Sequence, residues 1–144
     1  GYDLAADGRV TCDNIITESD MQKIFDISGY EFRGEKCRYF AGAGSVEELC
    51  ILRNTIYQPD FYNTATRPLE SVEALLFTEC GVYRHEGRVW VPLLAPKYAI
   101  GSGADFILSA MELGLNAQNA VKHACKFDTK SGGKIAVVSI NKRR

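Results

Sequence analysis

The order of the predicted strands and helices constrains the fold of this chain more than any other feature. Strands come first, followed by a helix, more strands, two consecutive helices and a final strand. Because this order lacks regular βαβ alternation, it argues against a doubly wound sheet and favours helices packed outside two stacked, mostly antiparallel sheets. The predicted strands cover residues 2–6, 9–12, 22–27, 38–41, 72–78, 88–91, 98–100 and 135–140.

The first helix is indicated by its ends and by its apolar periodicity. Ser45 and Glu48 form a capping box, so the helix begins after Ser45, and Pro59 marks its end. The polar residues 58–71, which include two prolines, are expected to form a surface loop. The apolar face of the helix is predicted to contain Val46, Leu49, Cys50 and Ile56.

Two further helices are predicted in the last third of the chain. Residues 104–113 are apolar nearly all round, so this helix is expected to be buried on most sides. Gly114 is its predicted C-cap, and Asn116 is the predicted N-cap of the next helix. Both helices are framed by glycine or polar residues, which indicates short connections.

Composition narrows the class of protein. The chain has 144 residues, which suits one domain over residues 1–144. Its net charge of -1 argues against a nucleic-acid binder, no apolar run approaches the length of a membrane span, and the start Gly1–Tyr2–Asp3 is not expected to belong to a signal peptide. Five scattered cysteines without a CxxC pair and only two histidines argue against a zinc site and suit a reducing cytoplasm.

Two glycine-rich segments each join a predicted strand to a predicted helix. Residues 42–44 and 101–103 could bind a phosphate, but neither completes GxGxxG and neither is followed by GK[ST]. They are also explained as tight turns, or as helix starts whose N–H groups stabilise an oxyanion. Residues 128–133 form a simple polar connection before the last strand, and no motif supports a serine or cysteine peptidase.

Taken in order, these segments resemble the proteasome β subunits and the bacterial peptidase HslV. The similarity lies in "AADGRVT", "QKIF" and "FAGAGSVEEL", and in residues 98–140, "YAIGSGADFILSAMELGLNAQNAVKHACKFDTKSGGKIAVVSI". It is strongest toward small bacterial or phage-type members with a short middle region. The resemblance implies an α+β fold, the four-layer αββα sandwich of N-terminal nucleophile (Ntn) hydrolases, here without its first strand.

The resemblance also implies a mechanism and roles for several residues. In this family a threonine at the start of the mature chain attacks a peptide carbonyl, with its own α-amine as base. Lys23 matches the lysine that lowers the pKa of the nucleophile, and Asp7 matches the carboxylate that pairs with that lysine. Gly42 matches the residue whose N–H stabilises the oxyanion, and Arg9 is expected near the substrate strand. Ser102, Asp128 and Ser131 match the group that orients the amine.

The chain departs from the family pattern in two places. It has no N-terminal threonine: Gly1 has no side chain, and Thr11 and Cys12 are internal. A strand and its turn, about ten residues, are therefore expected upstream of Tyr2. The loop at residues 58–71 replaces much of the second helix of larger members, which leaves the ring size open.

Three hypotheses follow for the function. The first is a threonine peptidase subunit that cleaves unfolded polypeptides without a cofactor, in a homo-oligomeric ring served by an ATP-dependent unfoldase. The second is a non-catalytic structural or binding subunit of the same family. The third is a nucleotide-binding α/β protein that uses the two glycine-rich segments.

Overall fold

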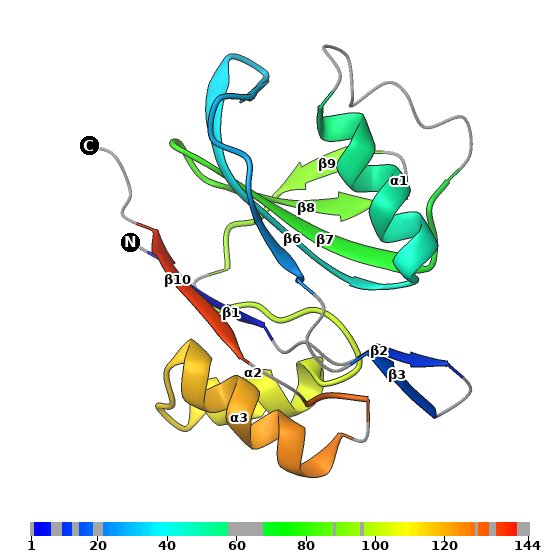
Figure 1. The fold of residues 1–144 in the computed structure, drawn as a ribbon. Helices are drawn as coiled ribbons and strands as arrows, with labels where there is room; N and C mark the ends of the chain where they lie inside the picture. The colour runs from blue at the N-terminus through cyan, green and yellow to red at the C-terminus, as the bar shows by residue number, and fades with distance from the viewer. Residues whose placement is uncertain are drawn as a thin grey trace. The chain divides into compact units, whose positions relative to one another are not determined.

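The computed structural model describes two compact units (Figure 1). One unit contains residues 24–94, and the other contains residues 1–23 and 95–142. Whether these two units form the single domain predicted over residues 1–144 depends on how they pack together, so that domain stays a prediction. The described residues are 2–6, 10–12, 15–18, 22–57, 68–87, 89–95, 97–128, 130–132 and 135–140.

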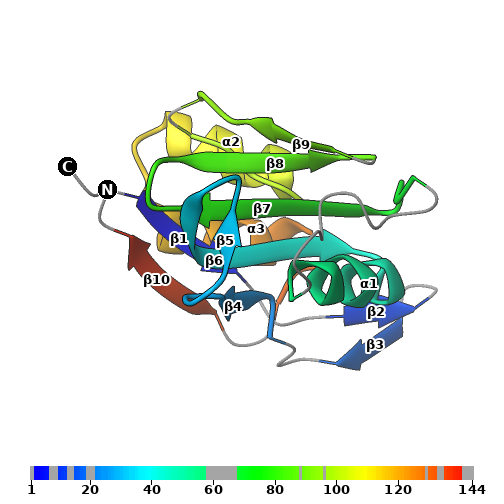
Figure 2. The ribbon, with the colours of Figure 1, turned by 90° about the horizontal axis from the view of Figure 1, so that it is seen from above.

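The unit of residues 24–94 is an antiparallel sheet with the strand order β4-β6-β7-β8-β9 (Figure 2). The short strand β5 pairs with β6 outside this path. The apolar run Ala74–Phe77 explains the position of β7 in the middle of the sheet order, since both faces of this strand carry buried aliphatic or aromatic side chains. The strands are β4 (Ile24–Asp26), β5 (Glu31–Phe32), β6 (Glu35–Gly44), β7 (Val72–Thr78), β8 (Val82–Glu86) and β9 (Val89–Pro92).

Helix α1 (Val46–Ile56) packs on β6 and β7, as Figure 1 shows. The predicted capping box forms only in part. The N–H of Glu48 donates to Oγ of Ser45 at 3.4 Å, but the Glu48 carboxylate accepts the N–H of Ser71, and the N–H of Ser45 donates to the carbonyl of Ser71. The predicted apolar face is correct only in part: Leu49 and Ile56 are buried, but Val46 is exposed. Leu52 takes the place of Val46 in the core, because its spacing from Leu49 and Ile56 follows the helical period.

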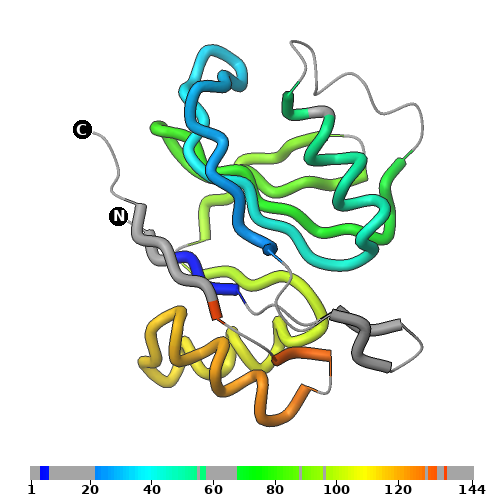
Figure 3. Tube along the Cα trace, viewed as in Figure 1, coloured from blue at the N-terminus to red at the C-terminus, as the bar shows by residue number. Residues whose placement is uncertain are grey.

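The sequence did not predict the hairpin of β5 and β6, whose turn can be followed along the trace in Figure 3. Its turn residues Arg33 and Gly34 have φ values of 52° and 81°, as a two-residue hairpin turn requires. The turn seats Phe32, which is fully buried, with its ring centroid 5.0 Å from that of Tyr83 and 6.5 Å from that of Trp90. The guanidinium of Arg33 lies over the ring of Phe32, and its Nη2 is 3.5 Å from the carbonyl oxygen of Trp90.

The other unit contains two pairs of strands and two helices. Strand β1 (Tyr2–Ala6) pairs with β10 (Ala136–Ile140), and β2 (Val10–Cys12) pairs with β3 (Ile15–Glu18), all antiparallel. Helix α3 packs on β1 and on α2. The sequence predicted β1, β2 and β10 but missed β3, and the short strand predicted at residues 98–100 is absent, because that segment forms no ladder.

The predicted N-cap of α3 (Ala117–Phe127) is confirmed, whereas the C-cap of α2 (Ala104–Glu112) is Leu113 and the predicted Gly114 follows it. Gly114 has a φ of 100° just after α2, and the side chain of Asn116 accepts the N–H of Asn119. The expectation that α2 is buried on most sides is wrong for this chain alone: Ala110 and Met111 are buried, whereas Phe106 is 39% exposed. Within the described residues, no helix combines the length and the apolar character needed to cross a membrane.

His85 makes the stability of the sheet depend on pH. It is buried beside Trp90, with a ring-centroid distance of 5.1 Å, and its Nδ1 has no hydrogen-bond partner. Burial lowers the pKa of His85 below its ordinary value of 6.5. The unfolded chain therefore binds a proton at this position at a higher pH than the folded chain does, which weakens folding below about pH 6.5.

We expect the free energy of unfolding to decrease as the pH falls from 7 to 5.5, with a His85 contribution of at most about 1.4 kcal/mol per pH unit. Urea unfolding at each pH measures this slope. The matched variant is His85→Phe, which keeps an aromatic ring beside Trp90 and removes the titrating group. If wild type and His85→Phe show the same slope, protonation of His85 does not limit stability.

Candidate active site

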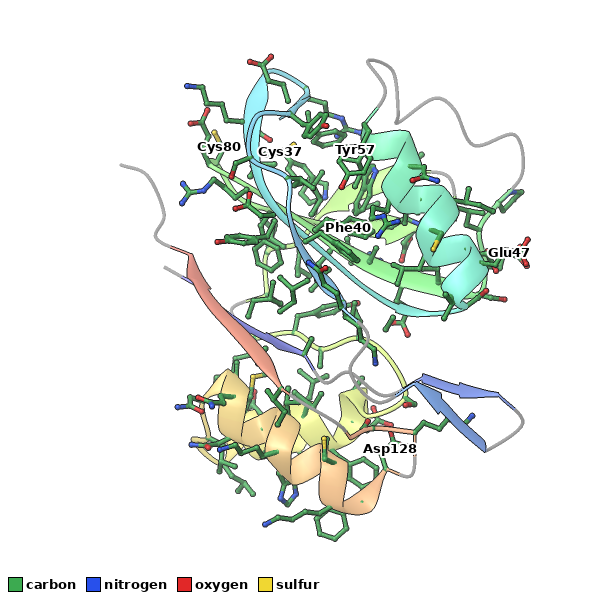
Figure 4. The ribbon with its side chains drawn as sticks, viewed as in Figure 1. Cys37, Phe40, Glu47, Tyr57, Cys80 and Asp128 are labelled. Carbon is green, nitrogen blue, oxygen red and sulfur yellow. The ribbon has the colours of Figure 1, made fainter. Side chains whose placement is uncertain are left out.

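Three of the predicted site residues form one hydrogen-bonded cluster, which we call the acceptor site: Ser102, Asp128 and Ser131. Ser102 precedes α2, and Asp128 is the C-cap of α3, where Figure 4 labels it. Local backbone contacts fix the turn between Asp128 and Ser131. The N–H of Asp128 donates to the carbonyl of Ala124 at 2.8 Å, and the N–H of Ser131 donates to the carbonyl of Asp128 at 3.1 Å.

Both serine hydroxyls donate to the same carboxylate oxygen. The Oγ of Ser102 lies 2.6 Å from Oδ2 of Asp128, and the Oγ of Ser131 lies 2.5 Å from that atom. These are short distances, as expected for hydroxyls that donate to an ionised carboxylate. The other oxygen, Oδ1, accepts the backbone N–H of Lys130 at 3.3 Å.

The acceptor site is built to stay negatively charged. Partial burial by itself would raise the pKa of Asp128, but the hydrogen bonds from Ser102 and Ser131 oppose this effect. The backbone N–H and the positive charge of Lys130 act in the same direction, so the pKa lies below its ordinary value of 3.8. Asp128 is therefore a carboxylate at neutral pH.

This arrangement determines what the acceptor site can bind. A serine hydroxyl has a single proton to donate, and in Ser102 and Ser131 that proton is used on Asp128. The lone pairs of both hydroxyl oxygens remain as acceptors beside a negative charge. The site is thus complementary to a group that donates N–H bonds and can carry positive charge, such as an amine.

Gly42 and Lys23 are described at other positions. Gly42 lies within β6 rather than in the predicted turn. The N–H of Ser45 donates to the carbonyl of Ser71, and alternation along the β6–β7 ladder then directs the N–H of Gly42 away from β7, toward the β4 side. Lys23 is half-buried and immediately precedes Ile24, the first residue of β4.

The described residues leave part of the predicted site untested. Ile24 pairs with Ala41, so Lys23 and Gly42 are each one residue beyond the same strand pair. Asp7 and Arg9 lie outside the described residues. Their predicted roles, and those of Lys23 and Gly42, stay predictions.

Within the described residues, a cysteine nucleophile and a metal site have less support than the acceptor site. The cysteines Cys37, Cys50, Cys80 and Cys125 are not in disulfides, and Figure 4 labels Cys37 and Cys80. Burial, with the charges of Glu35 and Glu31, raises the pKa of Cys37 to about 11, so this thiol is not an activated nucleophile. Among the same residues, no group of three or more His, Cys, Asp or Glu side chains could hold a metal ion.

Known structures with a similar fold cover nearly the whole chain. HslV from Trypanosoma brucei aligns with a TM-score of 0.67 at 18% identity, over 94% of this chain and 91% of that chain. Thiobacillus denitrificans BPH aligns with a TM-score of 0.75 at 19% identity, over 98% of this chain and 92% of that chain. The chain has the proteasome/HslV-type fold.

The proteasome/HslV-type fold confirms the resemblance and the α+β fold class predicted from the sequence. BPH in complex with epoxomicin also aligns, with a TM-score of 0.75 at 17% identity, over 99% of this chain and 93% of that chain. No protein-family model matches the sequence, and no curated protein matches it in sequence. At these identities the likeness establishes the fold, and the function has to be argued from the site.

Two residues outside the predicted site, Leu49 and Gly103, each lie close to a predicted site residue within their own unit. Leu49 of α1 packs directly on Gly42: a Cβ added at Gly42 would lie only 2.1 Å from Cδ1 of Leu49. Gly103 packs in the same way on the acceptor site. The sequence contains one indication that Gly103 matters: it is the second glycine of the segment Gly101–Ser102–Gly103. A tight turn before a helix also explains this glycine, so the sequence alone does not mark it as a site residue.

Proposed function

We propose that this protein is a threonine-type peptidase subunit that cleaves peptide bonds of unfolded proteins. The acceptor site is the observation that carries the proposal. Ser102, Asp128 and Ser131 present two hydroxyl oxygens beside a fixed negative charge, which suits the α-amine of an N-terminal residue. A peptidase of this kind needs that amine to be held and oriented as the base.

The other roles complete the mechanism. The threonine hydroxyl attacks the substrate carbonyl and passes its proton to the α-amine, whose ordinary pKa of about 7.7–8.0 suits a base at neutral pH. Lys23, paired with Asp7, lowers the pKa of the nucleophile. The N–H of Gly42 donates to the oxyanion, and Arg9 lies along the substrate strand.

The proposal places the threonine at the head of a strand that precedes Tyr2 in the natural protein. Mass spectrometry of the protein purified from its own organism reads the mature N-terminus directly. The same sample is then treated with epoxomicin, the ligand in the aligned BPH complex. Its ketone and epoxide offer two electrophilic carbons, which suits a residue that carries both a hydroxyl and an amine.

We expect the natural protein to gain the mass of one epoxomicin per chain and to cleave an unfolded substrate. The control is the same protein with its N-terminal threonine replaced by alanine, which should do neither, because the surrounding groups stabilise charge but cannot replace the nucleophile. The chain that begins at Gly1 should also remain unlabelled. A well-folded natural protein that neither labels nor cleaves would favour a structural or binding subunit.

We further propose that the protein works in the cytoplasm as a homo-oligomeric ring, with an unfoldase delivering substrates. Exposed apolar side chains at α2 and α3 support assembly: Leu113 is 82% exposed and Phe127 is 58% exposed. Phe127 also stacks on Phe106, with ring centroids 5.8 Å apart. Such side chains are typical of surfaces that become covered.

Sedimentation velocity at micromolar concentration should therefore show an oligomer. Phe127→Glu should shift the distribution toward monomer, because it places a charge in the apolar surface. A monomer alone, at all accessible concentrations, would contradict assembly and leave the proposed chemistry to be tested separately.

A further inference from the structure

Gly103 occupies a position that needs no glycine for backbone reasons. It precedes α2 with φ −87° and ψ 5°, the conformation of position i+2 in type I turns, which most residues with side chains can adopt. It is nevertheless buried. The reason for glycine at this position must therefore be space rather than conformational freedom.

The surrounding distances show what that space serves. A Cβ at residue 103 would lie 3.0 Å from Oγ of Ser131, 3.3 Å from Cβ of Ala124 and 3.5 Å from Oδ2 of Asp128. Two of these three atoms are the donor and the acceptor of one hydrogen bond of the acceptor site. An added methyl group would thus press on that bond from the side.

We propose that Gly103 is a positioning residue for the acceptor site: the absence of a side chain there lets the Ser131 hydroxyl reach Asp128. The expected effect of residue 103 on catalysis rests on the proposed function. The structural part, that residue 103 controls the hydrogen bond between Ser131 and Asp128, stands on the distances alone.

Ser131 as a whole residue has little room to move away from a larger side chain at position 103. It is buried, and its backbone N–H is already bonded to the carbonyl of Asp128 at 3.1 Å. Ala124, the other close neighbour, is 1% exposed within α3. With both neighbours confined, the expected response to an added methyl group is displacement of the Ser131 hydroxyl from Asp128.

The experiment is a double-mutant cycle with Gly103→Ala and Ser131→Ala. The primary measurement is the pKa of the Asp128 carboxyl group, followed by carbon-detected NMR titration of the natural chain. Gly103→Ala should raise this pKa toward 3.8, as Ser131→Ala does, because each weakens a hydrogen bond that favours the carboxylate. In the Ser131→Ala background, Gly103→Ala should cause no further shift, because the displaced oxygen is already gone.

The second measurement is kcat of the active natural protein. Gly103→Ala should reduce kcat with KM unchanged, by less than the roughly 10²-fold that a misplacement of about 1 Å causes, because contacts of 3.0 and 3.3 Å are relieved by smaller movements. The matched control is Gly81→Ala, because a Cβ at Gly81 meets nothing within 4 Å. That variant should change neither kcat nor the pKa of Asp128.

An unchanged Asp128 pKa in Gly103→Ala would overturn the inference, as would an equal shift in both backgrounds. If Gly103→Ala does not fold, the double mutant decides: a folded Gly103→Ala/Ser131→Ala protein supports the inference, and an unfolded one refutes it. The NMR result does not depend on catalysis. A protein without peptidase activity would refute the proposed function while leaving this test intact.

Discussion

Asp128→Asn reduces kcat of the full-length protein by about 10²-fold or more, while the protein stays folded. The basis for this expectation is that Asp128 accepts both serine hydroxyls on one oxygen and supplies the negative charge of the acceptor site. An asparagine side chain is neutral and directs N–H donors toward at least part of the same space. The two hydroxyls would reorient, and the amine that they hold would be misplaced.

The control for this variant is Asp105→Asn. Asp105 is an exposed carboxylate in the first turn of α2, so its loss removes the same charge close in sequence to Ser102 but outside the acceptor site. We expect kcat of Asp105→Asn to remain within a few-fold of the wild type. Equal kcat values for wild type and Asp128→Asn, measured with one unfolded substrate, would mean that the acceptor site does not orient the base.

Gly42→Ala is expected to lower both stability and activity, although alanine keeps the backbone N–H. The new methyl group would lie 2.1 Å from the built position of Leu49 Cδ1, and Leu49 is 4% exposed. Overpacking of this kind costs about 1–3 kcal/mol. The strain would be relieved by a new rotamer of Leu49 or by movement of α1 or β6, and activity falls to the extent that β6 moves and shifts the N–H proposed to bind the oxyanion.

Leu49→Val provides the matched rescue, because it removes one carbon atom near the position where Gly42→Ala adds one. The Gly42→Ala/Leu49→Val protein should recover about 0.5–3 kcal/mol relative to the sum of the single variants, measured by urea unfolding. Gly81→Ala, with open space around its Cβ, should change stability by less than about 0.5 kcal/mol. Additive single-variant effects would show that Leu49 does not restrict residue 42.

Local sequence signals predicted the elements whose ends are determined by a few neighbouring residues. The capping interaction of Ser45 and the N-cap Asn116 are examples, because each depends on a hydrogen bond within one helical turn. Strand β5 was missed because Glu31–Phe32 is too short for a periodic pattern. Its position depends on burial of Phe32 against Tyr83 and Trp90, which are distant in sequence.

The acceptor site could not be predicted from hydrophobic periodicity or from residue propensities. Ser102 and Asp128 are 26 positions apart, and each by itself is a common turn residue. Family resemblance selected them, and the structure shows that they are in contact with Ser131. Gly103 and Leu49 were not selected, because the restriction at each arises from atoms that only the folded chain brings close.

The contact between Arg33 and Trp90 has a consequence for how the protein behaves in a crowded solution. Strand β9 is at one end of the sheet order, next to β8. The N–H of Leu93 donates to the carbonyl of Val82 in β8, and the backbone groups of successive residues point alternately toward and away from the neighbouring strand. The carbonyl of Trp90, three residues before Leu93, therefore points away from β8. An outward carbonyl on an edge strand is a template for pairing with a foreign strand. Because the guanidinium of Arg33 lies at that oxygen and over the ring of Phe32, an intruding strand must displace a cation before it can add to the sheet. We therefore expect the turn at Arg33 to hinder the addition of a foreign strand at Trp90 of β9.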